Sequence, residues 1–339
     1  MPQYDILLIG DYFADLIFSG LSRLPELGRE IVGTGFDMAT GGACNTAIAM
    51  HRLGLKVGWA TDFGDDEFSR FALARMRGEG LDDTLFVPHK RPLRNITVSV
   101  SFPQDRAFIT FCDPRPKVPA AIRALATVSA RAVCVAGLYY GPFLDVGLAA
   151  IRLKRMKLIM DGNSSGEETL AVRAVKRAVQ NVDLFLPNAL EARRMTGKDD
   201  LKTAIRALSK LCPLVVVKDG PQGAYACARD EIVHAPAMAV KSVDTTGAGD
   251  CFNAGFIKAW LDGKPLIECL RWGNIVGALS TLASGGSGRV VTVADVERYL
   301  QDGQDGYSGD FLGRETPQPK RRGLKAALMQ LQSASSVSF

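Results

Sequence analysis

One string of small and acidic residues, 244–250 (DTTGAGD), stands directly before a helical pattern at 251–260. Free backbone N–H groups and the positive end of the helix dipole make a helix N-terminus an anion site. Gly247 and Gly249 have no Cβ atom, so a phosphate can approach the main chain closely. Asp250 would repel that anion. We therefore expect its carboxylate to have a chemical task.

The task that we predict for Asp250 is that of general base in phosphoryl transfer to an alcohol. Such a transfer needs a group that orients the hydroxyl and finally accepts its proton, while other groups stabilise the phosphoryl charge. The amides of residues 247–250, with Ala248 between the two glycines, would form that anion hole. We expect Asp250 to be a weak base, because the helix dipole favours its ionised form. The alternative is that Asp250 and the two threonines of the string only cap the helix.

Short apolar runs alternate with helical patterns along most of the chain. Strands are predicted at 6–10, 57–61, 132–136, 158–160, 184–186 and 214–217, and helices at 43–53, 67–77, 144–155, 170–179 and 201–211. Continuous apolar strands between helices are typical of a doubly wound, mostly parallel sheet with helices on both faces.

Two segments, about 15–38 and 95–111, instead alternate polar and apolar residues with period two, and the second has a turn signal at 103–105. This pattern predicts a small β-sheet that stands off the main sheet as a lid. An exposed sheet edge invites pairing with a second copy, which predicts a homodimer through the lid. We expect one α/β domain over residues 1–312 and a basic, mobile tail over 313–339, with a short helix at 324–331.

The composition excludes several classes of protein. The chain has 339 residues and a net charge of +5 that is spread along it, so a nucleic-acid partner is not expected. Its apolar runs are shorter than the ~18 residues of a membrane span. The seven cysteines form no C-x-x-C pair, which predicts buried free thiols and a reducing cytoplasm. Neither a P-loop nor a G-x-G-x-x-G fingerprint is present, and the three histidines are isolated.

A second string, 41–47 (GGACNTA), continues to Gly54 and Gly64. Together with the string at 244–250, about 200 residues later, it resembles the two signatures of the ribokinase-like (PfkB) carbohydrate kinase family. The similarity extends from Ile6 to about Val293. The resemblance implies a ribokinase-like fold with a β-sheet lid. It also implies ATP-dependent phosphorylation, with Mg²⁺, of a primary hydroxyl on a small sugar or sugar-like substrate.

The resemblance also assigns residues to the substrate. Asp15, with Asp11 before it, matches an acidic position that binds substrate hydroxyls at the end of the first strand. Gly41, Gly42 and Asn45 match the glycine pair and asparagine that hold the sugar. A carboxylate and an amide at loop ends suit vicinal hydroxyls, which need both acceptors and donors. The alternative is a plain turn at the glycines and a helix cap at Asn45.

Further matches lie on the nucleotide side. Asn188 and Glu191 resemble an N-x-x-E motif that organises magnesium, phosphate and water, although a helix cap has the same pattern. The string 218–223 resembles a K-x-G-x-x-G nucleotide loop and is also typical of a hairpin turn. Its matching residues are Lys218, Gly220 and Gly223. The string 161–163 (DGN) fits a D-x-N motif near the phosphates.

Three more residues carry weaker resemblances. Asn274 lies on a helix where family members often contact adenine. Thr246 is placed with the nucleotide-binding residues, and Asp244 and Thr246 match positions that ligate a monovalent cation in some relatives. The residues around 285–289 do not align clearly with the rest of that cation site, which leaves potassium dependence open.

Two other functions compete with a sugar kinase. A nucleoside kinase of the same superfamily needs an apolar wall for the base, which Phe102, Phe108 and Phe111 of the lid could supply, although simple lid packing accounts for them as well. A catalytically silent relative would bind sugar or nucleotide for regulation. Loss of the base or of the glycine anion site would favour such a relative, and both are intact here.

Overall fold

The computed structural model describes residues 2–101, 106–164, 168–283 and 285–302. The chain divides into two units, Met1–Asp305 and Gly306–Phe339, and all of the described residues belong to the first. The predicted domain boundary at 312, the tail and its helix, the turn at 103–105 and Phe102 lie outside the described residues.

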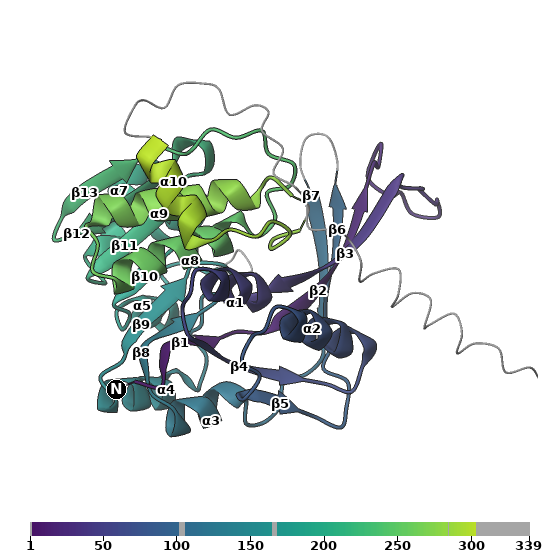
Figure 1. The fold of residues 1–339 in the computed structure, drawn as a ribbon, viewed down its shortest axis with the longest axis horizontal. Coiled ribbons are helices and arrows are strands. Elements are labelled where there is room, and N and C mark those ends of the chain that lie inside the picture. The colour runs from purple at the N-terminus through teal and green to yellow at the C-terminus, as the bar shows by residue number, and fades with distance from the viewer. Residues whose placement is uncertain (1, 102–105, 165–167, 284, 303–339) are drawn as a thin grey trace, which may run out of the picture. The chain divides into compact units, whose positions relative to one another are not determined.

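A nine-stranded sheet forms the centre of the described unit (Figure 1), in the order β13-β12-β11-β10-β9-β8-β1-β4-β5. Its strands are β1 (Tyr4–Ile9), β4 (Val57–Phe63), β5 (Phe86–Pro88), β8 (Ala130–Val135), β9 (Lys157–Asp161), β10 (Leu184–Leu186), β11 (Leu214–Lys218), β12 (Ala224–Ala228) and β13 (Glu231–Ala235). The strands from β11 to β5 are parallel, so the predicted doubly wound sheet is confirmed. The antiparallel hairpin of β12 and β13 at one edge was not expected.

Helices cover both faces of this sheet, each over its own apolar cluster. One face carries α1 (Ala43–Arg52), α2 (Glu67–Gly78), α8 (Ala248–Leu261), α9 (Leu266–Ser280) and α10 (Val293–Asp302). The other face carries α3 (Ala120–Thr127), α4 (Leu144–Leu153), α5 (Arg173–Val179), α6 (Ala189–Thr196) and α7 (Leu201–Ser209). On β1, Ile6 and Leu8 join the first cluster and Leu7 joins the second. The strand is therefore buried on both sides, as expected in a parallel sheet.

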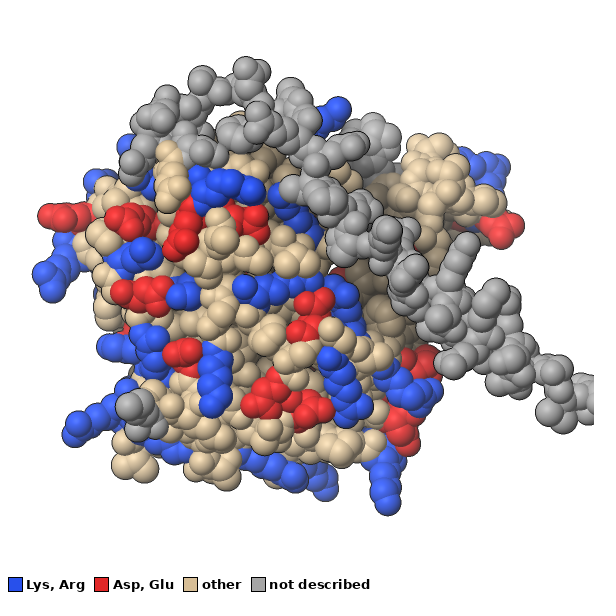
Figure 2. Space-filling view, viewed as in Figure 1, with Lys and Arg blue, Asp and Glu red and all other residues tan. Residues whose placement is uncertain are grey.

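The described residues also bear on the cysteines, on membrane-spanning helices and on the distribution of charge. All seven cysteines are free thiols, and only Cys112 is exposed. Among the described residues, none of the helices is long and apolar enough to span a membrane. On the face drawn in Figure 2, Lys and Arg side chains are interspersed with Asp and Glu side chains over the described residues.

The strand order reverses at β1, which pairs with β4 on one side and with β8 on the other. In open α/β sheets, ligands bind at the carboxyl ends of the strands at such a switch point. Gly10 follows β1 here, and a Cβ atom on it would lie 2.9 Å from the Cβ atom of Ala43. This glycine therefore allows the N-terminus of α1 to reach the switch point.

A separate four-stranded sheet confirms the predicted lid (Figure 1), in the order β3-β2-β6-β7. Its strands are β2 (Tyr12–Ser19), β3 (Gly35–Gly42), β6 (Asn95–Ser101) and β7 (Arg106–Cys112). Phe108 and Phe111 stand three residues apart on β7, so they point to opposite faces. Asp15 pairs with Thr97, and Thr97 with Thr110, which places Phe108 on the face of Asp15. The idea that both rings wall one nucleobase is therefore wrong.

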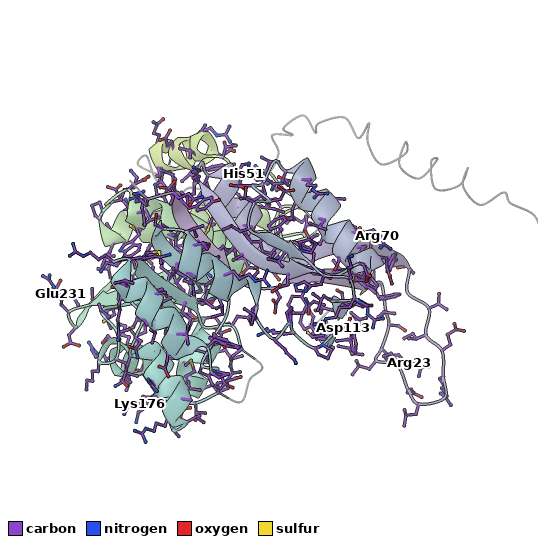
Figure 3. The ribbon with its side chains drawn as sticks, turned by 90° about the horizontal axis from the view of Figure 1, so that it is seen from below. Arg23, His51, Arg70, Asp113, Lys176 and Glu231 are labelled. Carbon is purple, nitrogen blue, oxygen red and sulfur yellow. The ribbon has the colours of Figure 1, made fainter. Side chains whose placement is uncertain are left out.

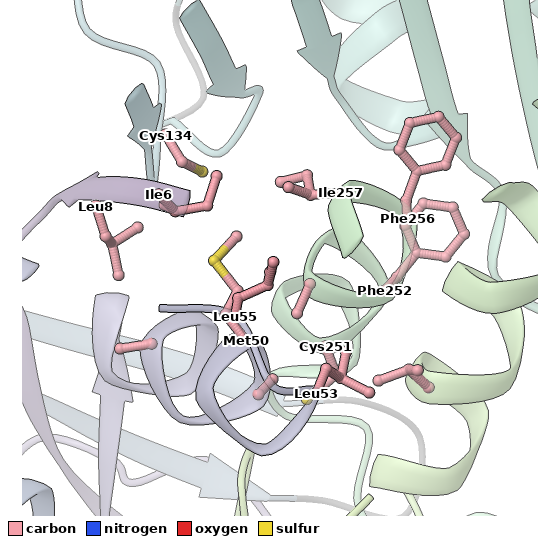
Figure 4. Packing of buried hydrophobic residues seen from close by; sticks show 14 of the residues in the cluster. Ile6, Leu8, Met50, Leu53, Leu55, Cys134, Cys251, Phe252, Phe256 and Ile257 are labelled. Carbon is pink, nitrogen blue, oxygen red and sulfur yellow. The ribbon is translucent and has the colours of Figure 1, made fainter. Parts of the chain in front are cut away.

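Glycines set the close packing of α8 against α9. A Cβ atom on Gly255 of α8 would lie 2.8 Å from the carbonyl oxygen of Trp272, and one on Gly273 of α9 would lie 2.7 Å from the ring of Phe252. Figure 4 shows Phe252 and Phe256 on one side of α8, while Ile257 points towards Ile6 of β1. The glycines thus fix α8 between its neighbours, and its N-terminus with it.

This packing predicts opposite effects of one substitution at two helical glycines. Gly255→Ala should lower the free energy of unfolding by about 1–3 kcal/mol, because the methyl group overpacks the α8–α9 contact. Gly78→Ala, at the exposed end of α2 with nothing within 4 Å of the added atom, should raise it by about 0.5–1 kcal/mol. Urea denaturation of both variants checks the signs. A stabilised Gly255→Ala protein would contradict the packing described here.

Candidate active site

The string 244–250 leads into α8 through Gly247, the N-cap residue, whose φ of 68° lies in the left-handed region. Within the described residues, this N-cap residue makes no side-chain cap hydrogen bond, so the helix does not begin with the ordinary cap of a Ser, Thr or Asp side chain. The first N–H groups of a helix have no acceptor within the helix. The amides of Gly249 and Asp250 in this first turn are therefore placed to meet an anion.

Asn45 of α1 is packed tightly against this turn. A Cβ atom on Gly247 would lie 2.5 Å from Cα of Gly286, and one on Gly286 would lie 2.4 Å from Nδ2 of Asn45. The side chain of Asn45 is buried, and within the described part of the chain its Oδ1 atom accepts no hydrogen bond. A buried acceptor without a partner is unusual. This atom is suited to receive a hydroxyl of a bound molecule.

The carboxylate of Asp250 lies against the first turns of α1. It accepts a hydrogen bond from the hydroxyl of Thr46 at 3.2 Å and from the amide of Asn45 at 3.4 Å. Burial first, and then the charge of Asp161, raise the pKa of Asp250 to about 7, although Lys218 acts in the opposite direction. The expectation that the helix dipole makes Asp250 a weak base is therefore wrong.

Lys218 stands in a closed set of polar contacts beside Asp250. Its ammonium group donates to Asp161 at 3.0 Å and to Oδ1 of Asn253 at 3.1 Å, while the amide of Asn253 donates to Asp161 at 2.8 Å. A Cβ atom on Gly249 would lie 3.8 Å from Nζ of Lys218. The sequence motif thus brings Lys218 to the N-terminus of α8, where its positive charge reinforces the anion site.

Asn188 and Glu191 form a capping box at the start of α6, as the helix-cap alternative predicted. The N–H group of each donates to the side chain of the other at 2.8 Å. Lys218 lies next to this capping box, because its backbone N–H group donates to the carbonyl oxygen of Pro187 at 3.1 Å. Burial raises the pKa of Glu191, partly offset by the charge of Lys218. The cap and a role near phosphate do not exclude each other.

The residues predicted to bind substrate come together, though not at loop ends as expected. Asp15 lies within β2 and Asn45 within α1. A Cβ atom on Gly41 would lie 2.1 Å from Oδ2 of Asp15, so Gly41 leaves room for this carboxylate. Burial and the charge of Asp244 raise the pKa of Asp15 to about 6. Gly42, with φ of 61°, connects β3 directly to α1.

Asp11 differs from the expectation, because it is paired within the chain. Its carboxylate lies 2.7 Å from the guanidinium of Arg115, on the segment that follows β7. Burial raises the pKa of Asp11, and Arg115 opposes the shift. Arg115 therefore links the lid segment to the end of β1, which no sequence pattern indicated.

Asp244 organises the loop before α8. Its Oδ1 atom accepts from both the N–H group and the hydroxyl of Thr246, and its Oδ2 atom accepts from the N–H group of Gly285 at 2.9 Å. Arg52 holds the 285–289 segment, because its guanidinium donates to the carbonyl oxygens of Ser287 and Arg289. Two further hydrogen bonds join this guanidinium to Glu79. These contacts keep the 285–289 segment against Gly247.

The other predicted nucleotide residues lie around the β11–β12 hairpin. Gly220 has a φ of 53° and Gly223 a φ of 93°, and a Cβ atom on Gly223 would lie 2.1 Å from the carbonyl oxygen of Ala235. The hairpin turn is thus confirmed. The amide of Asn274 donates to the carbonyl oxygens of Ala235 and Pro236, so it anchors the segment after β13.

Sequence reasoning missed four residues of this site. Three of them belong to strings or segments that the sequence had singled out: Thr46 to 41–47, Asn253 to the helix after 244–250, and Gly286 to 285–289. Helical spacing places Asn253 one turn after Asp250. Arg115 had no signal. Among the described residues, no group of three or more His, Cys, Asp or Glu side chains could hold a metal ion.

Comparisons with known proteins agree with this geometry. The family model described as "pfkB family carbohydrate kinase" matches residues 5–292. The ribokinase of Haemophilus influenzae is 24% identical over 305 residues, which cover 87% of this chain and 98% of that protein. The ribokinase of Arabidopsis thaliana, solved with ribose and ATP, has a TM-score of 0.74 at 21% identity over 88% of this chain and 99% of that one. The nucleoside kinase of Methanocaldococcus jannaschii has a TM-score of 0.72 at 19% identity over 88% and 98%.

Proposed function

Because the chain belongs to the pfkB family of carbohydrate kinases, which are phosphotransferases with an alcohol acceptor, we propose that it phosphorylates a primary hydroxyl of a small sugar or sugar-like substrate with ATP. One observation carries the proposal. A carboxylate with a raised pKa, Asp250, stands at the uncapped N-terminus of a helix beside the ammonium group of Lys218.

Asp250 acts in this proposal as the general base. Its two oxygens accept from Thr46 and Asn45, and each oxygen keeps a further lone pair for a substrate hydroxyl. A base is most effective when its pKa lies near the operating pH. The pKa of about 7 meets that condition, because burial and Asp161 disfavour the charged form. Asp250 would orient the attacking hydroxyl and take up its proton.

The phosphoryl charge is stabilised by groups that are already in place. The first amides of α8 supply backbone donors, and Lys218 supplies a positive charge that Asp161 and Asn253 hold in position. Donors fixed in a water-poor cleft stabilise developing charge without rearrangement during the reaction. The glycines at 247 and 249 keep side chains away from this surface.

Magnesium-bound ATP supplies the phosphoryl group, and the donor set fits it. Magnesium keeps most of its waters and needs only one or two carboxylates besides the phosphates. Glu191 and Asp161 are the carboxylates on this side of the site, and Glu191 would act through water. Asp244 already accepts hydrogen bonds through both oxygens, and a monovalent cation beside it remains a prediction.

The substrate end of the site favours a polyhydroxyl acceptor. The unpartnered Oδ1 atom of Asn45 and the carboxylate of Asp15 provide acceptors, and an amide provides donors as well. A nucleoside presents the same hydroxymethyl group and is the second candidate. A catalytically silent relative is disfavoured, because Asp250 and the anion site are both present.

The substitution Asp250→Asn tests the proposed base. The amide keeps the shape and one acceptor oxygen but cannot take up a proton, so turnover should fall by about 10²–10⁴, while ATP binding remains nearly intact. A coupled ADP-release assay over ribose, fructose, adenosine and cytidine measures turnover, and calorimetry measures ATP binding. Asp262→Asn, after the end of the same helix, is the matched control and should leave turnover unchanged. Near-normal turnover of Asp250→Asn would contradict the mechanism.

We also propose a homodimer through the lid, on an apolar face that the register assembles. The face of the lid opposite Asp15 carries four large apolar side chains: Phe18 of β2, Phe36 of β3, and Ile109 and Phe111 of β7. Phe36 is 63% exposed and Ile109 is 70% exposed. Isolated apolar side chains are common at a surface, but a contiguous apolar face is typical of an interaction site. A second lid of the same shape would cover it.

Sedimentation velocity at micromolar concentration tests the dimer. The protein should sediment as a dimer, and Ile109→Lys should convert it to a monomer, since the charge would be buried in the interface. Leu153→Lys, at an equally exposed apolar residue at the end of α4, should leave the dimer intact. A wild-type monomer would contradict the proposal.

A further inference from the structure

A cavity of about 470 Å³ opens beside the substrate residues and continues beneath α3 and α4. Its mouth is formed at the switch point of the sheet by Gly10, Asp11, Gly42 and Ala136. The volume lies within the range of about 300–1,000 Å³ that is typical of small-molecule sites. A bare pentose is smaller than the ligands for which such volumes are usual, so space remains beyond the sugar.

The inner part of the cavity is apolar. Side chains from two helices and from strands of the main sheet line it, among them Ile122, Leu125, Leu148, Ile151, Leu158 and Met160. Placing a charged group among these six side chains would cost several kcal/mol, because none of them carries a charge that could compensate for the lost water. The inner cavity therefore selects an uncharged occupant.

One polar group in the wall is also without a partner. Thr61 at the end of β4 is 2% exposed, and within the described residues its hydroxyl forms no hydrogen bond. Thr61 lines the cavity. Buried hydroxyls are normally hydrogen-bonded, so this one is an independent sign that the cavity is made to hold a molecule.

The proposed base and the cavity involve different residues at the start of α1. Asp250 contacts Asn45 and Thr46, whereas Ala43, the first residue of α1, and Gly42 before it line the cavity. A sugar whose hydroxyl meets Asp250 would thus direct its other end towards the cavity. Asp113, labelled in Figure 3, and Arg115 border the mouth where the chain leaves β7.

We propose that the acceptor is a sugar with an uncharged, largely apolar group attached, and that this group occupies the cavity beneath α3 and α4. The inference rests on the proposed kinase function and names the substrate class of the same site. Gly147 of α4 and Ala121 of α3 line the cavity and are the residues through which it can be filled. A Cβ atom on Gly147 would meet only Leu125, at 3.4 Å, so a larger side chain has room to enter.

The first arm of the test compares acceptors that differ only at the anomeric carbon: methyl, phenyl and 4-carboxyphenyl β-D-ribofuranoside. The phenyl riboside should have a kcat/KM at least about tenfold above that of the methyl riboside, since even one methylene in an apolar pocket is worth that factor. The carboxyphenyl riboside should lose the gain. Equal kcat/KM values for the methyl and phenyl ribosides would overturn the cavity proposal and leave the kinase function standing.

The second arm of the test uses variants whose larger side chains fill the cavity. Gly147→Leu should reduce the phenyl-to-methyl ratio of kcat/KM by about tenfold or more, and Ala121→Leu should do the same from the facing helix if Gly147→Leu does not fold. Gly78→Leu, at an exposed helical glycine, is the matched control and should keep the ratio. Thermal melting confirms that each variant is folded. An unchanged ratio in both folded cavity variants would overturn the proposal.

A binding measurement distinguishes failure of the proposed kinase function from failure of the cavity assignment. If no riboside is phosphorylated but calorimetry detects the phenyl riboside, and Gly147→Leu abolishes that binding, the kinase function fails and the cavity assignment holds. If the phenyl riboside neither binds nor reacts while the methyl riboside is phosphorylated, the cavity assignment fails and the kinase function stands; if no riboside binds or reacts, both fail.

Discussion

The site depends on keeping a negative charge, that of Asp250, in a partly buried position at an anion-binding helix terminus. Two like charges oppose this arrangement: Asp161 of the protein and, in the proposed reaction, the phosphoryl group of ATP. Lys218 compensates for both. The resulting pKa of about 7 makes Asp250 a better proton acceptor than an exposed aspartate would be. Burial disfavours the ionised carboxylate of Asp250 and so raises its pKa, and the raised pKa suits Asp250 to its proposed function as a base.

Close packing keeps these charges in place. Glycines let α8 approach α9, and the pair of Gly247 and Gly286 leaves a space into which the side chain of Asn45 fits. Arg52, partly buried together with Glu79, holds the 285–289 segment through two carbonyl oxygens. A side chain added at Gly247 or Gly255 would displace backbone, and one added at Gly273 or Gly286 would displace the side chain of Phe252 or Asn45. Such a site is positioned by rigid elements, while the lid supplies Asp15 from a separate sheet.

Much of the fold could be predicted, because apolar runs such as 184–186 mark buried strands, and the string at 244–250 places glycines and a carboxylate together at the start of a helix. The β12–β13 hairpin was missed, since its alanine-rich strand has little β-branched content. Site properties that join distant segments could not be predicted. The pairing of Arg115 with Asp11 depends on where the lid lies, and the pKa of Asp250 depends on burial and on Asp161 of another strand. The helix dipole, the one local effect visible in the sequence, gave the wrong direction.

The most direct test of this account is the pH dependence of kcat/KM for the wild-type protein with its best acceptor, measured from pH 5 to 9 at saturating magnesium and ATP. Because Asp250 accepts a proton only when ionised, and burial raises its pKa to about 7, kcat/KM should fall tenfold per pH unit below that point and level off above it. A profile that stays flat down to pH 5 would show either that Asp250 ionises as an ordinary aspartate or that its ionisation does not matter to the reaction. Either result would contradict the central claim.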